Sequence, residues 1–91
     1  MYKLKYTNQF KKSLKRCKKR GLDIDALSTV VTLLQATGTL PAKYKPHALI
    51  SNYKGCMECH IEPDWLLIWK QNNDELLLLL VDTGTHSDIF G

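Results

Sequence analysis

The spacing of the apolar residues changes at a loop bounded by two prolines, residues 41–46, and this change limits the folds open to the chain. Before the loop, apolar residues recur three or four positions apart, which is typical of helices with one buried face. Thr7 is a suitable N-cap for a helix over residues 8–20, and a second helix that ends at Gly38 follows a short link. Two such helices predict an antiparallel helical pair.

Strand patterns lie on both sides of this helical pair. Residues 3–6 alternate, and after the loop we predict strands over residues 49–53, 56–62 and 65–70. Residues 76–81 are continuously apolar, which predicts a strand covered on both faces, central in the sheet and followed by a short tail. The predicted fold class is α+β in the order β-α-α-β-β-β-β, an antiparallel sheet with both N-terminal helices packed on one face.

The chain is short and its charge is unevenly divided. Its 91 residues predict one small domain over residues 1–91. Residues 1–45 carry a net charge of +9 and residues 46–91 a net charge of −5, and seven of the ten residues from Lys11 to Arg20 are basic. A basic block of this density indicates a polyanion partner, such as RNA or a ribosomal surface, or else a solvated helix face.

The sequence shows none of the segments that direct a chain to a membrane. No apolar run follows the charges at the N-terminus, and the longest apolar run is far too short to span a bilayer. Three cysteines, an odd number without framework spacing, suit a reducing compartment. We therefore expect a cytoplasmic protein.

The segment Cys-Met-Glu-Cys-His at residues 56–60 matches the pattern for covalent haem attachment. Haem needs both cysteines and the histidine at one porphyrin, whereas residues three apart on a strand point to opposite faces. A zinc site would need a second closely spaced pair of ligands, and the chain has none. We predict no haem, no zinc and no other cofactor, and interpret Cys56 and Cys59 as buried or edge thiols.

Three histidines, His47, His60 and His86, each lie close to a predicted turn or strand end. An imidazole can donate or accept a proton near neutral pH, and RNA cleavage needs both steps, because the ribose 2′-hydroxyl loses a proton while the 5′-oxygen gains one. Asp64 follows Pro63 in a tight turn beside His60. These three histidines and Asp64 are candidate catalytic residues of a ribonuclease that requires no metal, although single histidines and turn aspartates are often structural.

Two aromatic residues are candidates for stacking on a base. Trp65 directly follows the turn, and Phe90 lies near the end of the chain. Stacking on such rings is common in proteins that bind single-stranded nucleic acid. The alternative for Trp65 is core packing, since it shares a strand face with Trp69, and the alternative for Phe90 is to clamp the tail.

Four segments together carry a resemblance to a known family. They read Tyr-Lys-Pro-His at 44–47, Asn-Tyr-Lys-Gly at 52–55, Glu-Cys-His-Ile-Glu-Pro-Asp-Trp-Leu-Leu-Ile-Trp-Lys at 58–70 and Thr-Gly-Thr-His-Ser-Asp-Ile-Phe at 83–90. This pattern, which covers essentially the whole chain, resembles the YafQ branch of the RelE/ParE toxin superfamily. The resemblance implies a RelE-like fold, a cognate antitoxin as partner in a type II toxin–antitoxin module, and cleavage of mRNA, typically in the translating ribosome.

The resemblance also implies which residues act. The active residues of the family fall on His47, His60, Asp64, Trp65, His86 and Phe90. We expect His86 to be the general acid and either His60 or Asp64 to be the general base or its orienter. His47 is expected to contact the phosphate or assist proton transfer, while the two aromatic residues position the base.

Two positions depart from the family pattern. The family usually has arginine where this chain has Asp82 and Met57. At the first position an arginine would neutralise the phosphorane whereas an aspartate would repel it, and one lost donor of this kind is worth about 3 kcal/mol. Either Lys45 or Lys54 can supply the cation instead, Asp82 can point away, or the chain can be a weakened or inactive toxin.

Two alternatives to an active nuclease belong to other functional classes. A non-catalytic module would keep the fold and bind the antitoxin and the ribosome without cutting RNA. A gyrase-directed toxin, as in the ParE branch, is disfavoured by the histidine set, because blocking a topoisomerase requires no general acid.

Overall fold

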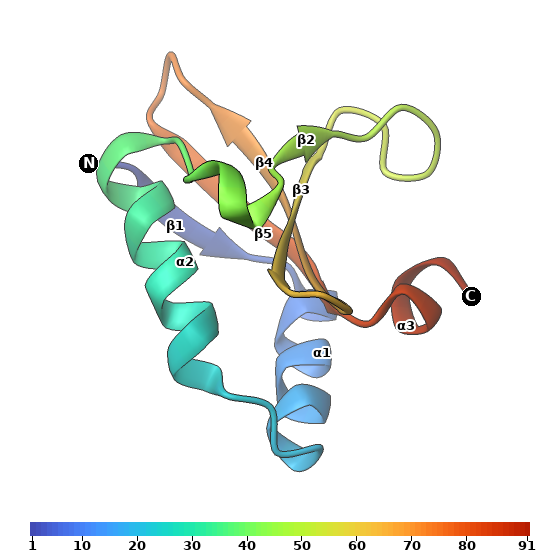
Figure 1. Cartoon of the computed structure of the whole chain (residues 1–91). Coiled ribbons are helices and arrows are strands. Elements are labelled where there is room, and N and C mark those ends of the chain that lie inside the picture. Colours follow the sequence, from blue (N-terminus) through green and yellow to red (C-terminus); the bar gives the residue numbers. More distant parts are fainter.

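The computed structural model describes all 91 residues, which form five strands, three α-helices and one short 3₁₀ turn (Figure 1). In chain order the elements are β1 (Lys3–Tyr6), α1 (Asn8–Lys19), α2 (Ile24–Thr37), η1 (Ala42–Tyr44), β2 (His47–Ala48), β3 (Met57–Glu62), β4 (Trp65–Asn72), β5 (Leu77–Gly84) and α3 (His86–Phe90). The strands form one sheet in the order β1-β5-β4-β3-β2. The predicted α+β fold is confirmed.

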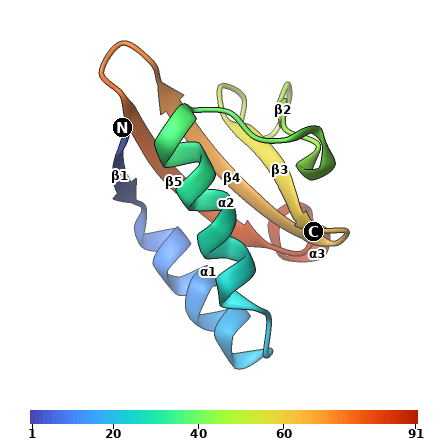
Figure 2. The same ribbon diagram turned by 60° about the vertical axis from the view of Figure 1, so that its left-hand side comes forward.

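Helices α1 and α2 run in opposite directions and cover one face of the sheet (Figure 2). The Thr7 hydroxyl caps α1 by accepting from the backbone N–H of Phe10 at 2.9 Å, as predicted. Gly38 ends α2 in the left-handed conformation, with φ 75°. No helix of the chain is both long enough and apolar enough to cross a membrane. The core lies between these helices and the sheet and consists of Phe10, Cys17, Leu27, Val30, Leu34, Cys59, Ile61, Trp65, Leu67, Trp69, Leu78 and Leu80.

The sheet is mixed, so the prediction of an antiparallel sheet was wrong at one pairing. Strand β1 runs parallel to β5, whereas β2–β3, β3–β4 and β4–β5 are antiparallel. Parallel neighbours need a long connection between them, and here it comprises all the elements from α1 to β4. The turn residues that predict hairpins concern only strands adjacent in sequence. They therefore contain no information about the pairing of β1 with β5.

Strand β5 lies inside the sheet, as its apolar run predicts, but only one of its faces is covered by helices. Leu78 and Leu80 are buried against the helices, while the residues that alternate with them are half-buried on the other face. The strand also continues past Val81 to Gly84, because its ladder with β4 resumes after a bulge opposite Ile68 and Trp69.

One local prediction was wrong. Residues 49–53 form no strand of the sheet, and only His47–Ala48 pair with β3 ahead of a loop in which Tyr53 has φ 61°. The short tail that we expected after the last strand contains a helix, α3, which was not predicted. Thr85 begins this helix through a capping box with Asp88, and the Thr-x-x-Asp spacing of that cap is visible in the sequence.

Candidate functional site

The three histidines form a row on the face of the sheet that the helices leave open. Strand β3 turns Cys59 into the core, so the alternate residues Glu58 and His60 face the other way. His47 on β2 pairs with Glu58, and His86 begins α3. Ring centroids are 6.3 Å apart for His47 and His60 and 5.8 Å apart for His60 and His86. The fold thus assembles the three predicted proton-transfer groups at one place.

At one end of the row, Asp64 holds His86. Nδ1 of His86 lies 2.6 Å from Oδ1 of Asp64, and the backbone N–H of His86 donates to the same oxygen at 3.1 Å. These hydrogen bonds hold the pKa of Asp64 below its usual value, so the group remains an ionised acceptor. Nδ1 must therefore carry a proton, which leaves Nε2 of this exposed ring free to exchange a proton with a substrate.

At the other end, His47 lies between two acceptors. Its Nδ1 is 2.8 Å from the carbonyl oxygen of Lys45, and its Nε2 is 3.1 Å from Oε1 of Glu58. Both ring nitrogens of His47 are therefore engaged, one by a backbone carbonyl and the other by a carboxylate.

Glu58 is a functional candidate that the sequence alone did not single out. Glu58 is only 4% exposed, and its Oε2 is buried without a hydrogen-bond partner. A buried carboxylate that is only half paired is energetically costly, which points to a role beside His47. The available signal was its position two residues before His60, since alternate residues on a strand share one face.

His60 lies in the middle of the row, with Nδ1 3.2 Å from the carbonyl oxygen of Pro63. Donation to that carbonyl leaves Nε2 free. His60 also lines an open pocket of about 410 Å³ together with Lys43 and Lys45. Lys54 lines a different pocket, so of the two predicted substitute cations the structure brings only Lys45 to the row.

Asp82 is buried, and its carboxylate is already engaged. It is 4% exposed and accepts hydrogen bonds from the Ser13 hydroxyl at 2.5 Å and from the Thr83 backbone N–H at 2.8 Å. It does lie on the same face of the sheet as Glu58, because Ile68 pairs with both residues. Its charge is nevertheless bound to α1 and to its own backbone instead of being presented to the histidines.

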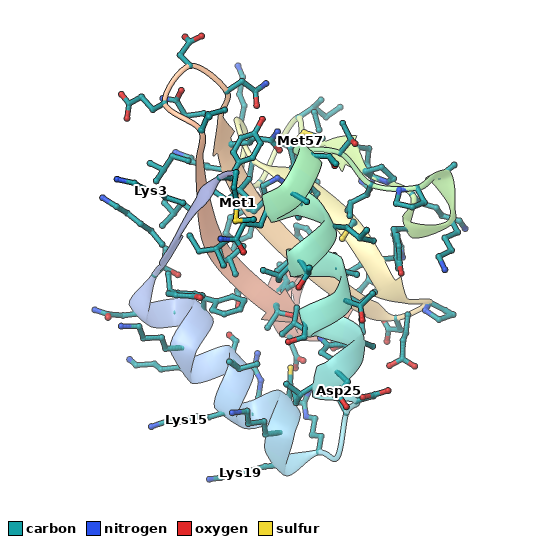
Figure 3. The ribbon with its side chains drawn as sticks, turned by 90° about the vertical axis from the view of Figure 1, so that its left-hand side faces the viewer. Met1, Lys3, Lys15, Lys19, Asp25 and Met57 are labelled. Carbon is teal, nitrogen blue, oxygen red and sulfur yellow. The ribbon has the colours of Figure 1, made fainter.

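Of the two aromatic candidates, only Phe90 is accessible. It is 38% exposed and meets Tyr53 edge-on, with ring centroids 6.1 Å apart. Trp65 is 2% exposed and its indole N–H donates to the Thr83 hydroxyl at 2.9 Å, so the expected base stacking on Trp65 is not supported because its ring has no free face. Met57, labelled in Figure 3, is half-buried and packs against the core.

The structure gathers no group of three histidine, cysteine or carboxylate side chains that could hold a metal ion. All three cysteines are buried free thiols, and burial raises the pKa of Cys59 to about 12. Such a thiol is an inert packing group.

Comparison with known proteins finds relatives along the whole chain. Residues 2–91 match the sequence model of a family described as "Bacterial toxin of type II toxin-antitoxin system, YafQ". The chain is 44% identical over 89 residues to mRNA interferase toxin YafQ of Escherichia coli strain B / BL21-DE3 and 42% identical to that of strain K12, in each case covering 97% of this chain and 95% of the relative.

The structure is likewise similar to solved structures over the full length of both chains. It matches the crystal structure of YafQ from E. coli strain BL21(DE3) with a TM-score of 0.91 and 41% identity. It matches a chain of the E. coli DinJ–YafQ complex with a TM-score of 0.88 and 41% identity, again with full coverage of both chains.

Proposed function

The chain belongs to the YafQ family of bacterial toxins from type II toxin–antitoxin systems, and we propose that it is an mRNA interferase, an endoribonuclease that inhibits translation. The observation that carries this proposal is the row of three imidazoles that ends in the His86–Asp64 pair. Such a row supplies an acid and a base on one open face, which is sufficient for cleavage by the RNA's own 2′-hydroxyl. The names of the E. coli relatives support the same activity.

In the proposed mechanism His60 is the general base and His86 the general acid. Nε2 of His60 takes the proton of the 2′-hydroxyl, and the 2′-oxygen attacks the adjacent phosphorus. The bond from phosphorus to the 5′-oxygen breaks as Nε2 of His86 gives its proton to that oxygen. The products are a 2′,3′-cyclic phosphate and a 5′-hydroxyl. Asp64 orients His86 instead of acting as the base, because one of its oxygens accepts both hydrogen bonds from His86.

Lys45 takes the place of the family's arginine in this proposal. It lines the same pocket as His60 and faces the phosphate as that group gains charge in the transition state, with His47 beside His60 as a further phosphate contact. Asp82 does not oppose them directly, because its carboxylate is bound by Ser13 and Thr83. We therefore expect an active enzyme in spite of the missing arginine.

We further propose a cognate antitoxin as partner and ribosome-bound mRNA as substrate, in the cytoplasm. The crystal structures of E. coli YafQ in complex with DinJ support the antitoxin. Lysines of α1, among them Lys15 and Lys19, project away from the body of the molecule (Figure 3). This basic surface suits contact with the phosphates of ribosomal RNA.

The test compares the purified chain with its His86→Ala variant on an end-labelled RNA oligonucleotide and on messages in expressing cells. We expect the variant to lose cleavage by about 10²- to 10⁴-fold, and the unaltered chain to leave 2′,3′-cyclic phosphate ends. Ser87→Ala, an exposed neighbour on α3, is the matched control. Equally intact RNA with the unaltered chain and with His86→Ala would contradict the nuclease proposal.

Asp82 also favours one second candidate, a non-catalytic module that binds the antitoxin and the ribosome. In that case the unaltered chain cuts no RNA and Asp82→Arg switches cleavage on. Cleavage by the unaltered chain excludes this candidate.

A further inference from the structure

We propose that Asp88 is a positioning residue, which clamps α3 to α1 through Arg20 and so holds His86 against Asp64. The consequence for cleavage rests on the proposed function, whereas the clamp itself follows from the geometry. The two can therefore be tested separately.

Helix α3 needs an external anchor. It has five residues, His86–Phe90, and none of them is buried. A helix of this length has no stability of its own in water. Yet its first residue keeps a hydrogen bond to Asp64, which lies 22 positions earlier in the chain.

A single carboxylate both starts α3 and ties it to α1. The two oxygens of Asp88 accept from Nη1 and Nη2 of Arg20 at 2.5 Å and 3.0 Å, a bidentate contact across 68 positions of sequence. Oδ2 also accepts from the backbone N–H of Thr85 at 2.9 Å, and the Thr85 hydroxyl accepts from the backbone N–H of Asp88 at 3.1 Å. The cap and the ion pair thus share one side chain.

The surroundings of Asp88 reinforce this contact. Arg16, one turn before Arg20 on α1, places Nη2 3.8 Å from Oδ2 of Asp88, and its Nε and Nη2 are buried without a hydrogen-bond partner. A Cβ at Gly84 would lie 2.9 Å from the Cβ of Asp88, so the end of β5 fits directly against α3. The Arg20 contact is the main cause that holds the pKa of Asp88 well below its usual range. Two of the seven basic residues from Lys11 to Arg20 thus face the carboxylate of Asp88.

The clamp matters because His86 must present Nε2 at a defined place. A displacement of about 1 Å in a catalytic group can lower the rate about 100-fold. Loss of the clamp leaves the imidazole chemically intact but reduces the time that it spends bonded to Asp64. We therefore expect kcat to fall while KM for RNA, which depends on the rest of the row, stays nearly constant.

The experiment uses the full chain with two changes that break the ion pair in different ways. Asp88→Asn keeps an oxygen for the Thr85 cap but removes the charge, whereas the double variant Arg16→Met/Arg20→Met keeps the cap and removes both guanidinium groups. The controls are Asp25→Asn, an exposed acid in the first turn of α2, and Lys3→Met on β1. Both control positions are labelled in Figure 3.

Two measurements test the clamp and its effect on cleavage. Hydrogen exchange of the His86 amide, which donates to Asp64, should accelerate about tenfold or more in both clamp variants, with β5 amides and both controls unchanged. Single-turnover cleavage of a short free RNA should slow about 10- to 100-fold, with KM within about twofold of the unaltered chain.

Each outcome has a separate meaning. An unchanged His86 amide in both clamp variants overturns the clamp, whether or not the chain cuts RNA. Faster exchange with an unchanged cleavage rate overturns the positioning role, and exchange that accelerates equally at His86 and throughout β5 overturns a local clamp. If the unaltered chain cuts no RNA, the proposed function fails, while the exchange measurement still decides the clamp.

Discussion

At the residue scale, the partners of the three imidazoles distinguish side chains that are chemically identical. Asp64 accepts from Nδ1 of His86, Glu58 faces Nε2 of His47, and His60 meets only a backbone carbonyl. The ring at each end of the row therefore has a carboxylate partner, and the ring in the middle has none. This difference suits His60 to the proposed role of base and His86, held by Asp64, to that of acid.

The role of Glu58 is testable by substitution. Glu58→Gln keeps an acceptor for His47 but removes the carboxylate charge beside it, so we expect kcat for RNA cleavage to fall about tenfold. The measurement is the single-turnover cleavage rate, with Glu75→Gln in the β4–β5 turn as control. A rate identical to that of the unaltered chain assigns Glu58 a purely structural role.

Substitution of the two aromatic candidates should change different properties, namely stability for Trp65 and RNA affinity for Phe90. Trp65→Phe removes a buried indole and its bond to Thr83, so we expect a loss of about 1–3 kcal/mol of stability and unchanged RNA affinity. Phe90→Ala removes an exposed ring, so we expect affinity to weaken by about 1–3 kcal/mol with little change in unfolding. Urea unfolding and RNA titration measure both effects. Weaker RNA binding by a fully stable Trp65→Phe chain would restore the stacking role of Trp65.

At the element scale, much of the site is built where elements begin and end, although His60 lies within β3. His47 opens β2, Asp64 lies in the turn after β3, and His86 opens α3. Side chains at such ends are free of the core, while the elements behind them remain rigid. The positions of the element ends, and therefore of the site, depend on the residues that terminate each helix and strand.

Gly38 is one such terminus, and its replacement tests how tightly it is packed. Its φ is 75°, and a Cβ there would clash with the Tyr2 hydroxyl. We expect Gly38→Ala to destabilise the fold by about 2–4 kcal/mol, which combines left-handed strain with a steric clash. Gly21→Ala is the matched control, because its φ is 80° but a Cβ would meet nothing within 4 Å. Equal losses in urea unfolding would show that the contact with Tyr2 is unimportant.

At the scale of the whole molecule, a few polar and charged contacts add to the hydrophobic core in joining the two halves of the chain. Helix α1 is strongly basic, and the segment from β5 to α3 brings acids against it at Asp82 and Asp88. These contacts join residues about 70 positions apart. They hold the first helix to the strand and helix that end the chain.

The dependence of stability on pH should show this coupling. Because the folded-state pKa of Asp88 is lowered, its ionised form stabilises the fold above the unfolded pKa of about 3.9, and this contribution is lost as the pH falls towards the folded value. The unaltered chain should therefore be more stable than Asp88→Asn at pH 5–7, and the difference should shrink below about pH 4. Urea unfolding across this range measures it. A difference that grows in acid would contradict the assignment.

Much of the fold and of the site could be predicted because the signals are local. The cap at Thr7, the stop at Gly38 and the alternation through β3 each depend on residues within a few positions of one another. The candidate proton-transfer residues were also recognisable as residue types near turns. By itself the sequence determined most of the elements, the family and the histidine set.

Only the tertiary structure decided which of these residues meet. The parallel pairing of β1 with β5, the burial of Trp65, the contact of Glu58 with His47 and the clamp of Asp88 on Arg20 all depend on strand register and on which face of the sheet the helices cover. A shift of one residue in register would exchange the two faces of a strand. Local preferences do not specify that choice, because it is set by the packing of elements that lie far apart in the chain.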